Sequence, residues 1–309
     1  MKIICDQHIP FLLEAVQKEW PHVEILTMKP EEIDAFSLRD ADVLVVRTRT
    51  KVNEQLLAGS SVRLVCTATI GFDHIDTAYC ETHGIRWMAC PGCNAQAVCD
   101  YIEEALMETH AEGTIGIVGV GHVGSLVAQM AERRGMSVLL NDPPKGIGVS
   151  LDFIGRNCDI ITFHVPLDRT TFHLCNEAFL NICKPDAVII NAARGGVVDE
   201  QALLRSGHPY ILDTWENEPN IDQEVLEHAL RASMHIAGYS VEGNRKATQM
   251  CLNKIAEVFG LPQIDISGYR YNGITSDIKN NEPWLAAITD SLKAHPEQFE
   301  TLRKHYPLR

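Results

Sequence analysis

The apolar positions of this chain fall into short runs that alternate with stretches of helical spacing. In the first hundred residues, short apolar runs predict strands, and residues 11–20 have the three- and four-residue apolar spacing of a helix. The strands are expected at residues 2–5, 43–47 and 64–67. Strands that alternate with helices in this way indicate a parallel sheet covered by helices.

A second series of the same kind begins at residue 113. Its expected strands are residues 113–120, 137–141, 160–164, 187–191 and 210–213. A glycine turn and a helix to residue 134 follow the first of these strands, and a helix over about 94–111 precedes it. From about residue 261 the chain has several Gly, Pro and Asn residues and only short helical stretches, which indicates an appendage rather than a third full domain.

Length and charge narrow the class of protein. A chain of 309 residues is long enough for about two domains. Its 27 basic and 41 acidic residues give a net charge of −14, which argues against a nucleic-acid partner or an anionic membrane surface, since both select an excess of Lys and Arg. The sequence contains no run of 18 apolar residues, so it predicts no membrane span. An acidic protein that binds an anion must gather its few basic residues in one place.

The cysteines indicate a reducing compartment and no metal site. Ten cysteines are scattered along the chain, several of them in apolar runs, and the first residues lack the apolar stretch of a secretory signal. We therefore expect a cytoplasmic protein with reduced thiols. Cys90 and Cys93 form a C-x-x-C pair, but there is no second such pair and no histidine at zinc-ligand spacing, so the pair is expected to belong to a loop.

A glycine-rich turn is the first candidate for cofactor binding. Gly119, Gly121 and Gly124 fit the pattern G-x-G-x-x-G, with an apolar strand before them and a helical stretch after them. The first glycine allows a tight turn, the second lets backbone amides approach a pyrophosphate, and the third lets the helix pack close to the sheet. The phosphate charge then lies at the positive end of the helix. The alternative is a glycine turn that binds no ligand.

The acidic residue that follows favours one dinucleotide over the other. Asp142 ends the next strand, 18 residues after Gly124, where its carboxylate can accept hydrogen bonds from the ribose hydroxyls. A 2′-phosphate there would meet a negative charge, so we expect NAD rather than NADP. Lys145, three residues further on, could weaken this preference.

Three polar segments follow later strands, where open α/β sheets bind their ligands. They contain Arg194, Glu218 and His235. Hydride transfer from a secondary alcohol needs a base for the hydroxyl proton, which a histidine with a carboxylate partner supplies. An arginine can hold a substrate carboxylate with two parallel hydrogen bonds. Taken singly, Arg194 would more often be a surface cation, Glu218 a solvated acid and His235 a structural histidine. Together, and after a dinucleotide motif, the three residues predict a catalytic set.

These motifs resemble those of the D-isomer-specific 2-hydroxyacid dehydrogenases. The resemblance rests on the glycine motif, on N-x-x-R-G at residues 191–195, on L-D-x-W-x-x-E-P at residues 212–219 and on the late histidine, and it runs from about residue 1 to 260. Within the family, the chain most resembles the members that oxidise 4-phospho-D-erythronate in pyridoxal phosphate biosynthesis. The strings that carry this closer resemblance are residues 46–53, 67–74, 91–95, 142–144 and 235–243.

The resemblance implies an α/β fold of two domains with doubly wound parallel sheets. A flavodoxin-like substrate-binding domain would span residues 1–93 and about 239–260, and a Rossmann-type NAD-binding domain residues 94–238. A short extension over 261–309 would resemble part of the domain through which many such enzymes form homodimers. The implied reaction is the NAD-dependent oxidation of a small phosphorylated hydroxy acid, 4-phospho-D-erythronate, at C2, with closure of the cleft between the domains to exclude water.

The resemblance also assigns roles to single residues. Arg194 would orient the substrate, Glu218 would polarise the histidine, and His235 would exchange the proton. The residues implied to contact NAD are Gly119, Gly121, His122, Val123, Gly124, Asp142, Val165, Ala193, Asp213 and Gly238. Those implied to contact the substrate are Thr48, Thr69 and Tyr239, with Arg47 and Lys51 as partners for its phosphate or carboxylate.

The sequence departs from its relatives in several places and leaves alternatives open. Thr48 stands where the phosphoerythronate enzymes usually have serine, and Val165 stands where a threonine would bond to the cofactor. The extension is also much shorter than the usual dimerisation domain. The alternative activities are those of relatives that act on phosphoglycerate, glycerate or glyoxylate. A non-catalytic, NAD-sensing dimer is the alternative from another functional class.

Overall fold

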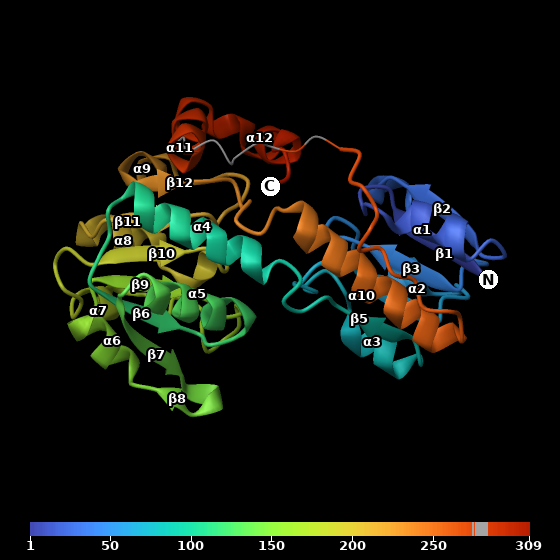
Figure 1. Ribbon diagram of the computed structural model, residues 1–309, viewed down its shortest axis with the longest axis horizontal. Helices are drawn as coiled ribbons and strands as arrows, with labels where there is room; N and C mark the ends of the chain where they lie inside the picture. The colour runs from blue at the N-terminus through green and yellow to red at the C-terminus, as the bar shows by residue number, and fades with distance from the viewer. Residues whose placement is uncertain (274, 276–283) are drawn as a thin grey trace. The chain divides into compact units, whose positions relative to one another are not determined.

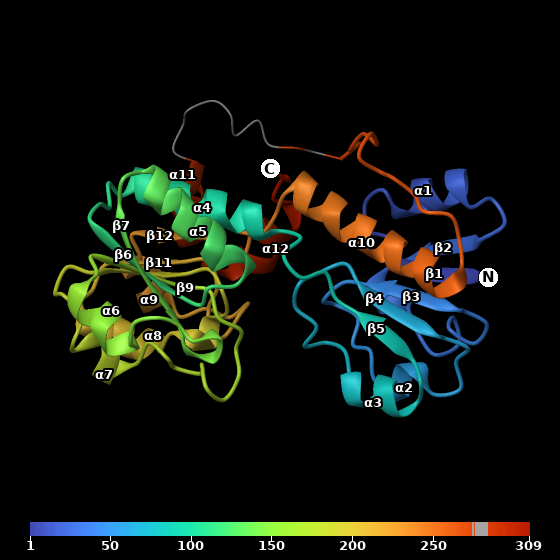
Figure 2. The same cartoon turned by 60° about the horizontal axis from the view of Figure 1, so that its bottom comes forward.

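The computed structural model describes residues 1–273, 275 and 284–309 and divides the chain into two compact units (Figures 1 and 2). The first unit consists of Met1–Asn94 and Ser240–Ile274, and the second of Ala95–Tyr239 and Thr275–Arg309. The extension predicted over 261–309 is therefore shared between the two units. Residues 274 and 276–283 of that extension lie outside the described residues.

The first unit contains a five-stranded sheet with the strand order β2-β1-β3-β4-β5. Its strands are β1 (Lys2–Asp6), β2 (Glu24–Met28), β3 (Val43–Val46), β4 (Leu64–Thr67) and β5 (Arg86–Met88). All neighbouring strands pair in parallel. This is the flavodoxin-like order, in which the direction of winding changes between β1 and β3.

Each face of this sheet has its own core, because alternate residues of a strand point to opposite faces. The helices of the unit are α1 (Leu12–Glu19), α2 (Glu54–Leu57), α3 (Thr77–Thr82) and α10 (Val241–Phe259). Ile3 and Cys5 of β1 pack with α1 and α10, whereas Ile4 packs with α2 and α3. Figure 2 shows the first pair of helices on one side of the sheet and the second pair on the other.

Helix α10 completes the first unit, although it lies far from the five strands in sequence. The Ser240 hydroxyl caps its start by accepting a hydrogen bond from the Gly243 amide at 2.9 Å. The helix ends at Gly260, which has a left-handed φ of 67°. Its buried side chains, among them Cys251 and Leu252, cover the apolar face formed by β1, β3 and β4.

The second unit contains a seven-stranded sheet with the order β12-β11-β10-β9-β6-β7-β8. Its strands are β6 (Thr114–Val118), β7 (Ser137–Asp142), β8 (Ile147–Gly148), β9 (Ile160–Phe163), β10 (Val188–Asn191), β11 (Tyr210–Leu212) and β12 (Arg231–Ala232). All pairs are parallel except β7 with β8. β6 lies between β7 and β9, so the order reverses there, and doubly wound sheets bind ligands beyond the carboxyl ends of the strands at such a point.

Helices cover both faces of this second sheet (Figure 2). They are α4 (Ala95–Glu108), α5 (His122–Arg133), α6 (Leu151–Asn157), α7 (Glu177–Leu180), α8 (Glu200–Ser206) and α9 (Gln223–His228). Ile115 and Ile117 of β6 pack with α4 and α5, whereas Val118 packs in the core formed with α6 to α9. None of the helices among the described residues is long and apolar enough to cross a membrane.

The C-terminal segment packs on the second unit through apolar side chains. Its helices are α11 (Trp284–Ala294) and α12 (Phe299–His305). Leu285, Leu292 and Phe299 are fully buried in the cores of this unit. The Thr289 hydroxyl accepts a hydrogen bond from the Ala232 amide at 2.9 Å, which holds α11 beside β12. These apolar side chains are therefore buried within a single chain.

Candidate active site

The predicted glycine motif forms the turn between β6 and α5. Gly119 has a φ of 93°, and a Cβ there would lie 2.6 Å from the carbonyl oxygen of His164. A Cβ on Gly124 would collide with the carbonyl oxygen of Gly119, whereas one on Gly121 would meet no atom within 4 Å. Packing thus requires two of the glycines, and the third leaves open space at the N-terminus of α5. Free backbone amides and the helix dipole favour an anion at this point, which fits the pyrophosphate of a dinucleotide.

Asp142 lies beside this turn at the end of β7. Its Oδ2 accepts a hydrogen bond from the Val120 amide at 2.9 Å, and Lys145 Nζ lies 3.3 Å from the same oxygen. Lys145 also donates to the Val120 carbonyl at 2.6 Å, so its charge is held next to the carboxylate. The second oxygen, Oδ1, has no partner among the described residues. A ribose hydroxyl can donate to it while Oδ2 stays anchored.

His235 and Glu218 form a hydrogen-bonded pair, with His235 Nδ1 and Glu218 Oε2 2.9 Å apart. Glu218 Oε1 accepts a second hydrogen bond, from the Trp215 amide at 2.9 Å, which fixes the orientation of the carboxylate. Because Nδ1 donates to the carboxylate, Nε2 keeps a lone pair that can accept a proton. His235 has a φ of 58°, a left-handed conformation that is uncommon outside glycine and is found more often at functional sites.

The Glu218 carboxyl is kept in its charged form by its surroundings. Burial raises its pKa, but the hydrogen bond and charge of His235, the Trp215 amide and the charge of Arg303 together bring the pKa below its ordinary value. An ionised carboxylate on Nδ1 fixes the tautomer that presents Nε2 and stabilises the imidazolium that forms when Nε2 takes a proton. The pair is therefore suited to general acid–base catalysis.

Asp213 holds the loop that carries His235. The residue is only 1% exposed, and its Oδ1 accepts hydrogen bonds from the Ser233 hydroxyl at 2.6 Å and the Ile236 amide at 2.7 Å. Oδ2 accepts one from the Ala237 amide at 3.0 Å, and the Asp213 carbonyl accepts one from the His235 amide at 2.7 Å. The sequence predicted Asp213 as a contact of NAD; in the structure both carboxylate oxygens bond to the protein on either side of the histidine.

Arg194 lies in a tight turn that follows β10. The Asn191 side chain closes this turn, since Nδ2 donates to the Arg194 carbonyl at 2.8 Å and Oδ1 accepts from the Ala193 amide at 3.1 Å. Arg194 Nη1 donates to the Ala193 carbonyl at 2.8 Å. A Cβ on Gly195 would collide with the backbone of Trp215, so the glycine allows this turn to contact the segment that leads to Glu218.

The other residues predicted to contact NAD also lie in the second unit. His122 and Val123 form the first turn of α5. Val165 lies against the glycine motif, because a Cβ on its first glycine would come within 2.8 Å of Val165 Cγ1. Ala193 belongs to the arginine turn, and Gly238 follows the loop that carries the histidine. All ten residues that the sequence predicted to contact NAD therefore lie in the second unit.

The basic residues predicted to contact the substrate lie in the first unit and are not all together. A hollow of about 570 Å³ is lined by Thr48, Arg49, Lys51, Val52, Asn53, Asp73, His74, Ile75 and Asp76. Arg47 is not among its lining residues; its Nη1 donates to the His8 carbonyl at 3.3 Å. Thr69 lies after β4, and its hydroxyl donates to the Gly71 carbonyl at 2.9 Å. The hollow contains carboxylates as well as cations, so its charge is mixed.

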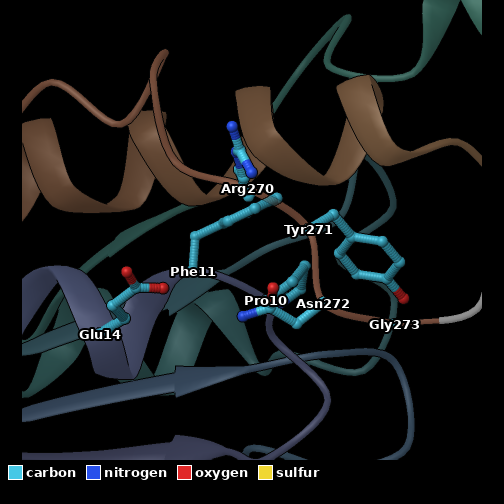
Figure 3. A pocket seen from close by; sticks show the side chains of 7 residues that line it. All are labelled: Pro10, Phe11, Glu14, Arg270, Tyr271, Asn272 and Gly273. Carbon is cyan, nitrogen blue, oxygen red and sulfur yellow. The ribbon is translucent and has the colours of Figure 1, made fainter.

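A smaller hollow of the first unit contains none of the predicted site residues (Figure 3). Its volume is about 200 Å³, and it is lined by Pro10, Phe11, Glu14, Arg270, Tyr271, Asn272 and Gly273. Phe11 has a left-handed φ of 66°, and the Arg245 guanidinium lies 4.5 Å from the centre of its ring. The rings of Phe11 and Tyr271 are 6.0 Å apart, so aromatic packing accounts for this corner of the unit.

The C-x-x-C pair belongs to the core of the first unit. Cys90 and Cys93 are buried, and Cys90 Sγ donates to the Ala247 carbonyl at 3.4 Å. The Sγ atoms of Cys90 and Cys251 lie 3.8 Å apart. The pair therefore joins the loop before α4 to helix α10 through apolar packing.

One group of polar side chains was not predicted from the sequence. His173 Nε2 lies 2.6 Å from Glu216 Oε1, and Asp199 completes a set whose ligand atoms lie within 4.8 Å of one another. The Glu216 amide donates to the buried Glu200 carboxylate at 2.7 Å. Burial raises the pKa of Glu200 to about 7, although the Glu216 amide opposes this shift. These contacts hold the segment that precedes Glu218.

Comparison with known proteins identifies the family. A family model described as "D-isomer specific 2-hydroxyacid dehydrogenase, NAD binding domain" matches residues 96–246. A protein of Bacteroides fragilis named erythronate-4-phosphate dehydrogenase is 42% identical, over 100% of this chain and 97% of its own. The chain belongs to the D-isomer-specific 2-hydroxyacid dehydrogenase family. A protein of Coxiella burnetii with the same name is 34% identical, over 100% of this chain and 93% of its own.

Solved structures of this family have the same two-domain fold. The D-lactate dehydrogenase of Aquifex aeolicus complexed with NAD and lactic acid is 26% identical, with a TM-score of 0.67 over 84% of this chain and 96% of its own. The NAD⁺-bound 3-phosphoglycerate dehydrogenase of Entamoeba histolytica is 25% identical, with a TM-score of 0.72 over 84% and 95%. The predicted fold class is confirmed, and the chain is an NAD-dependent 2-hydroxyacid dehydrogenase.

The sequence did not predict the residues that the C-terminal segment adds near the loop that carries His235. Arg303 of α12 donates from Nε to the Tyr239 hydroxyl at 3.1 Å. Arg309 donates to the Ala237 carbonyl and, at 3.3 Å, to the Tyr239 carbonyl. Arg303 lies in the last turn of α12, where basic residues are common because they interact favourably with the helix dipole, and Arg309 follows the helix, so no sequence pattern marked either residue.

Proposed function

We propose that this dehydrogenase oxidises 4-phospho-D-erythronate at C2 to (R)-3-hydroxy-2-oxo-4-phosphooxybutanoate, a step of pyridoxal phosphate biosynthesis. The observation that carries the proposal is the 2.9 Å Glu218–His235 pair in a chain that is 42% identical, along its whole length, to a protein named for this activity. A charged carboxylate on a histidine is suited to removing the proton of a hydroxyl group. NAD, when bound, accepts the hydride.

His235 removes the hydroxyl proton of the substrate at Nε2. The C2–H bond breaks as a hydride leaves, the C2–O bond becomes a carbonyl, and the proton of the hydroxyl moves to the imidazole. Glu218 stabilises the resulting imidazolium through the hydrogen bond to Nδ1. In the reverse reaction the imidazolium returns this proton to the carbonyl oxygen, so His235 serves as acid and base in turn.

Arg194 binds the carboxylate of the substrate and so orients C2. Its turn is closed by Asn191 and packed against the Trp215 backbone, which limits the positions that the guanidinium can take. A planar guanidinium can form two parallel hydrogen bonds with a carboxylate, whereas an ammonium group cannot. The remaining contacts follow the assignment made from the sequence: Thr48, Thr69, Tyr239, Arg47 and Lys51 for the substrate, and the glycine motif, Asp142 and their neighbours for NAD.

The two units divide these tasks in our proposal. The unit built on Ala95–Tyr239 binds NAD and carries the catalytic three, and the other unit contributes Thr48 and Thr69 to substrate binding. We further propose that the enzyme is a cytoplasmic homodimer. The ten free cysteines, nine of them buried, support a reducing compartment. Light scattering on the purified protein tests the dimer, and cell fractionation tests the compartment.

The decisive experiment compares substrates on the purified enzyme. NADH formation is measured with 4-phospho-D-erythronate, 3-phospho-D-glycerate and D-glycerate. With glyoxylate, which is reduced, the consumption of NADH is measured instead. We expect the highest kcat/KM for 4-phospho-D-erythronate. A higher value for another of these acids would contradict the proposed substrate while leaving the family intact. Tight NADH binding without turnover of any of them would mean that the chain is a binding protein rather than an enzyme.

A further inference from the structure

Helix α12 brings a cation to the residues around the catalytic pair. Arg303 Nε donates to the Tyr239 hydroxyl at 3.1 Å, and the guanidinium lies 6.0 Å from the centre of the Tyr239 ring. Tyr239 is four residues after His235 in sequence and is one of the residues assigned to substrate contact. The Arg303 side chain is 23% exposed, so it is largely covered but can be reached by a ligand.

The charge of Arg303 acts on the catalytic carboxylate. Burial lowers the pKa of the guanidinium, but Tyr239 and the charges of Glu218 and Glu300 raise it above its ordinary value, so the group stays protonated. Arg303 is in turn one of the groups that lower the pKa of Glu218. The two opposite charges thus stabilise each other.

Most of the hydrogen-bonding capacity of Arg303 remains available to a ligand. A guanidinium has five N–H donors. Nε bonds to a neutral phenol, and Nη1 lies 3.4 Å from Glu300 Oε1 in a partly exposed ion pair. Nη2 has no partner among the described residues. A largely covered cation with free donors is suited to an anion, and a phosphate offers the paired oxygens that a guanidinium binds best.

The end of the chain fixes this arrangement. Arg309 donates to the carbonyls of Ala237 and Tyr239, and its guanidinium lies 4.7 Å from the centre of the Trp284 ring. The ring of Tyr306 lies 6.5 Å from that of Tyr239. The segment after α12 is therefore anchored to the loop that carries the catalytic histidine, and a side chain anchored in this way can hold a ligand with little loss of freedom.

We propose that Arg303 binds the phosphate group of the substrate. With Arg194 on the carboxylate, the second unit then supplies one guanidinium for each anionic end of the molecule. The C-terminal segment would thus determine the preference for a phosphorylated acid, a task that the sequence had assigned to Arg47 or Lys51. This inference rests on the proposed function, because it assumes a substrate with a phosphate at the end opposite the carboxylate.

The test compares two substrates that differ only in the phosphate. For Arg303→Gln, kcat/KM with 4-phospho-D-erythronate should fall by about a hundredfold, mainly through KM, because two hydrogen bonds to a charged group are lost. The value with D-erythronate should fall by a much smaller factor, because only the effect that Arg303 exerts through Tyr239 and Glu218 is lost there. Arg303→Lys should keep part of the preference, since the charge remains. The matched control is Lys304→Gln, which removes an exposed cation from the same helix and should leave both values unchanged.

Several outcomes would overturn the inference. Equal losses on both substrates would mean that Arg303 acts only by positioning Tyr239 or Glu218, and a shifted pH profile of kcat would then accompany them. If Arg47→Gln lowered kcat/KM only for the phosphorylated substrate and Arg303→Gln did not, the phosphate would be bound by the first unit instead. Calorimetric binding of 4-phospho-D-erythronate in the presence of NADH, which cannot accept a hydride from it, gives the same comparison without turnover, and unchanged binding in Arg303→Gln also contradicts the proposal. Circular dichroism verifies that each variant is folded.

The proposed function can fail separately from this inference. If the unmodified enzyme oxidises 3-phospho-D-glycerate but not 4-phospho-D-erythronate, the proposed substrate is wrong. Arg303→Gln is then tested with 3-phospho-D-glycerate against D-glycerate, and the same selective loss is expected. If no phosphorylated acid binds to or is oxidised by the unmodified enzyme, both proposals fall.

Discussion

Replacing Glu218 and His235, singly and together, tests whether the two residues act as one unit. His235→Ala removes the base, which is typically worth about 10²–10⁴-fold in rate, so kcat should fall by that factor with little change in NAD binding. Glu218→Gln keeps the shape of the side chain and an acceptor for the Trp215 amide, but it removes the charge next to Nδ1. Its effect depends on how much that charge contributes.

The structure sets the size of this contribution. A hydrogen bond to a charged partner contributes about 1.5–3 kcal/mol. The side chains of His235 and Glu218 are 31% and 19% exposed, so solvent screening favours the lower end of this range. Because about 1.4 kcal/mol corresponds to a tenfold change in rate, Glu218→Gln should lower kcat by roughly tenfold. In the double variant the glutamine has no imidazole to act on, so kcat should equal that of His235→Ala within about threefold.

The assay is initial-rate NADH formation at saturating substrate and NAD, with NADH binding measured by fluorescence for every variant. The matched control is Glu216→Gln, because Glu216 lies in the same segment but pairs with His173. It should lower kcat much less than Glu218→Gln does. If the losses of the two single variants multiply in the double variant, Glu218 does not act through His235 and the mechanism is wrong.

Four other changes test separate parts of the structure. Asp142→Ala should weaken NAD binding and narrow the preference for NAD over NADP, measured as the ratio of the two KM values; equal use of both cofactors by the unmodified enzyme would contradict the assignment. Gly124→Ala should abolish NAD binding in fluorescence titrations, because the new Cβ collides with the Gly119 carbonyl, whereas Gly268→Ala, at a glycine with open space around it and no left-handed φ, should not. Arg194→Lys should raise KM and lower kcat and recover only part of the activity lost in Arg194→Ala, because an ammonium cannot make paired contacts. Burial raises the pKa of Glu200 to about 7, so its carboxyl stabilises the fold below its ordinary pKa of 4.5, and this stability is lost as pH rises through about 7. Glu200→Gln should therefore raise the free energy of unfolding, measured in urea, by about 2.5 kcal/mol more at pH 8 than at pH 5.

The elements predicted from the sequence are those whose patterns were least ambiguous. β3 and β4 are buried along their whole length, and such unbroken apolar runs are easily identified. β2 and β5 were not predicted, because β2 has only one buried residue and β5 is a three-residue edge strand with none. Arg194, Glu218 and His235 could be proposed as catalytic because hydride transfer demands their chemistry. The sequence did not predict the close contact between Gly195, in the turn that carries Arg194, and the Trp215 backbone.

Roles that depend on the partners of a side chain could not be predicted. Asp213 stands in a motif that suggests a cofactor contact, but whether its oxygens are already bonded depends on where Ser233 and Ala237 lie in space. Arg303 lies 64 residues beyond Tyr239 in sequence, and no periodicity relates two residues so far apart. Such contacts arise from the packing of α12 on the second unit, which depends on the buried ring of Phe299.

The discontinuity of the first unit has a consequence for biosynthesis. Its five strands lie within the first 88 residues, but the helix that covers one of their apolar faces begins only at Val241. On the ribosome, that face stays without its cover until the whole of Ala95–Tyr239 has been made. A nascent chain that stalls before α10 therefore exposes Ile3, Val43 and Leu64 to other chains, a state prone to aggregation. The NAD-binding region emerges before the unit that precedes it can finish folding, which makes chaperone protection most important for the N-terminal strands.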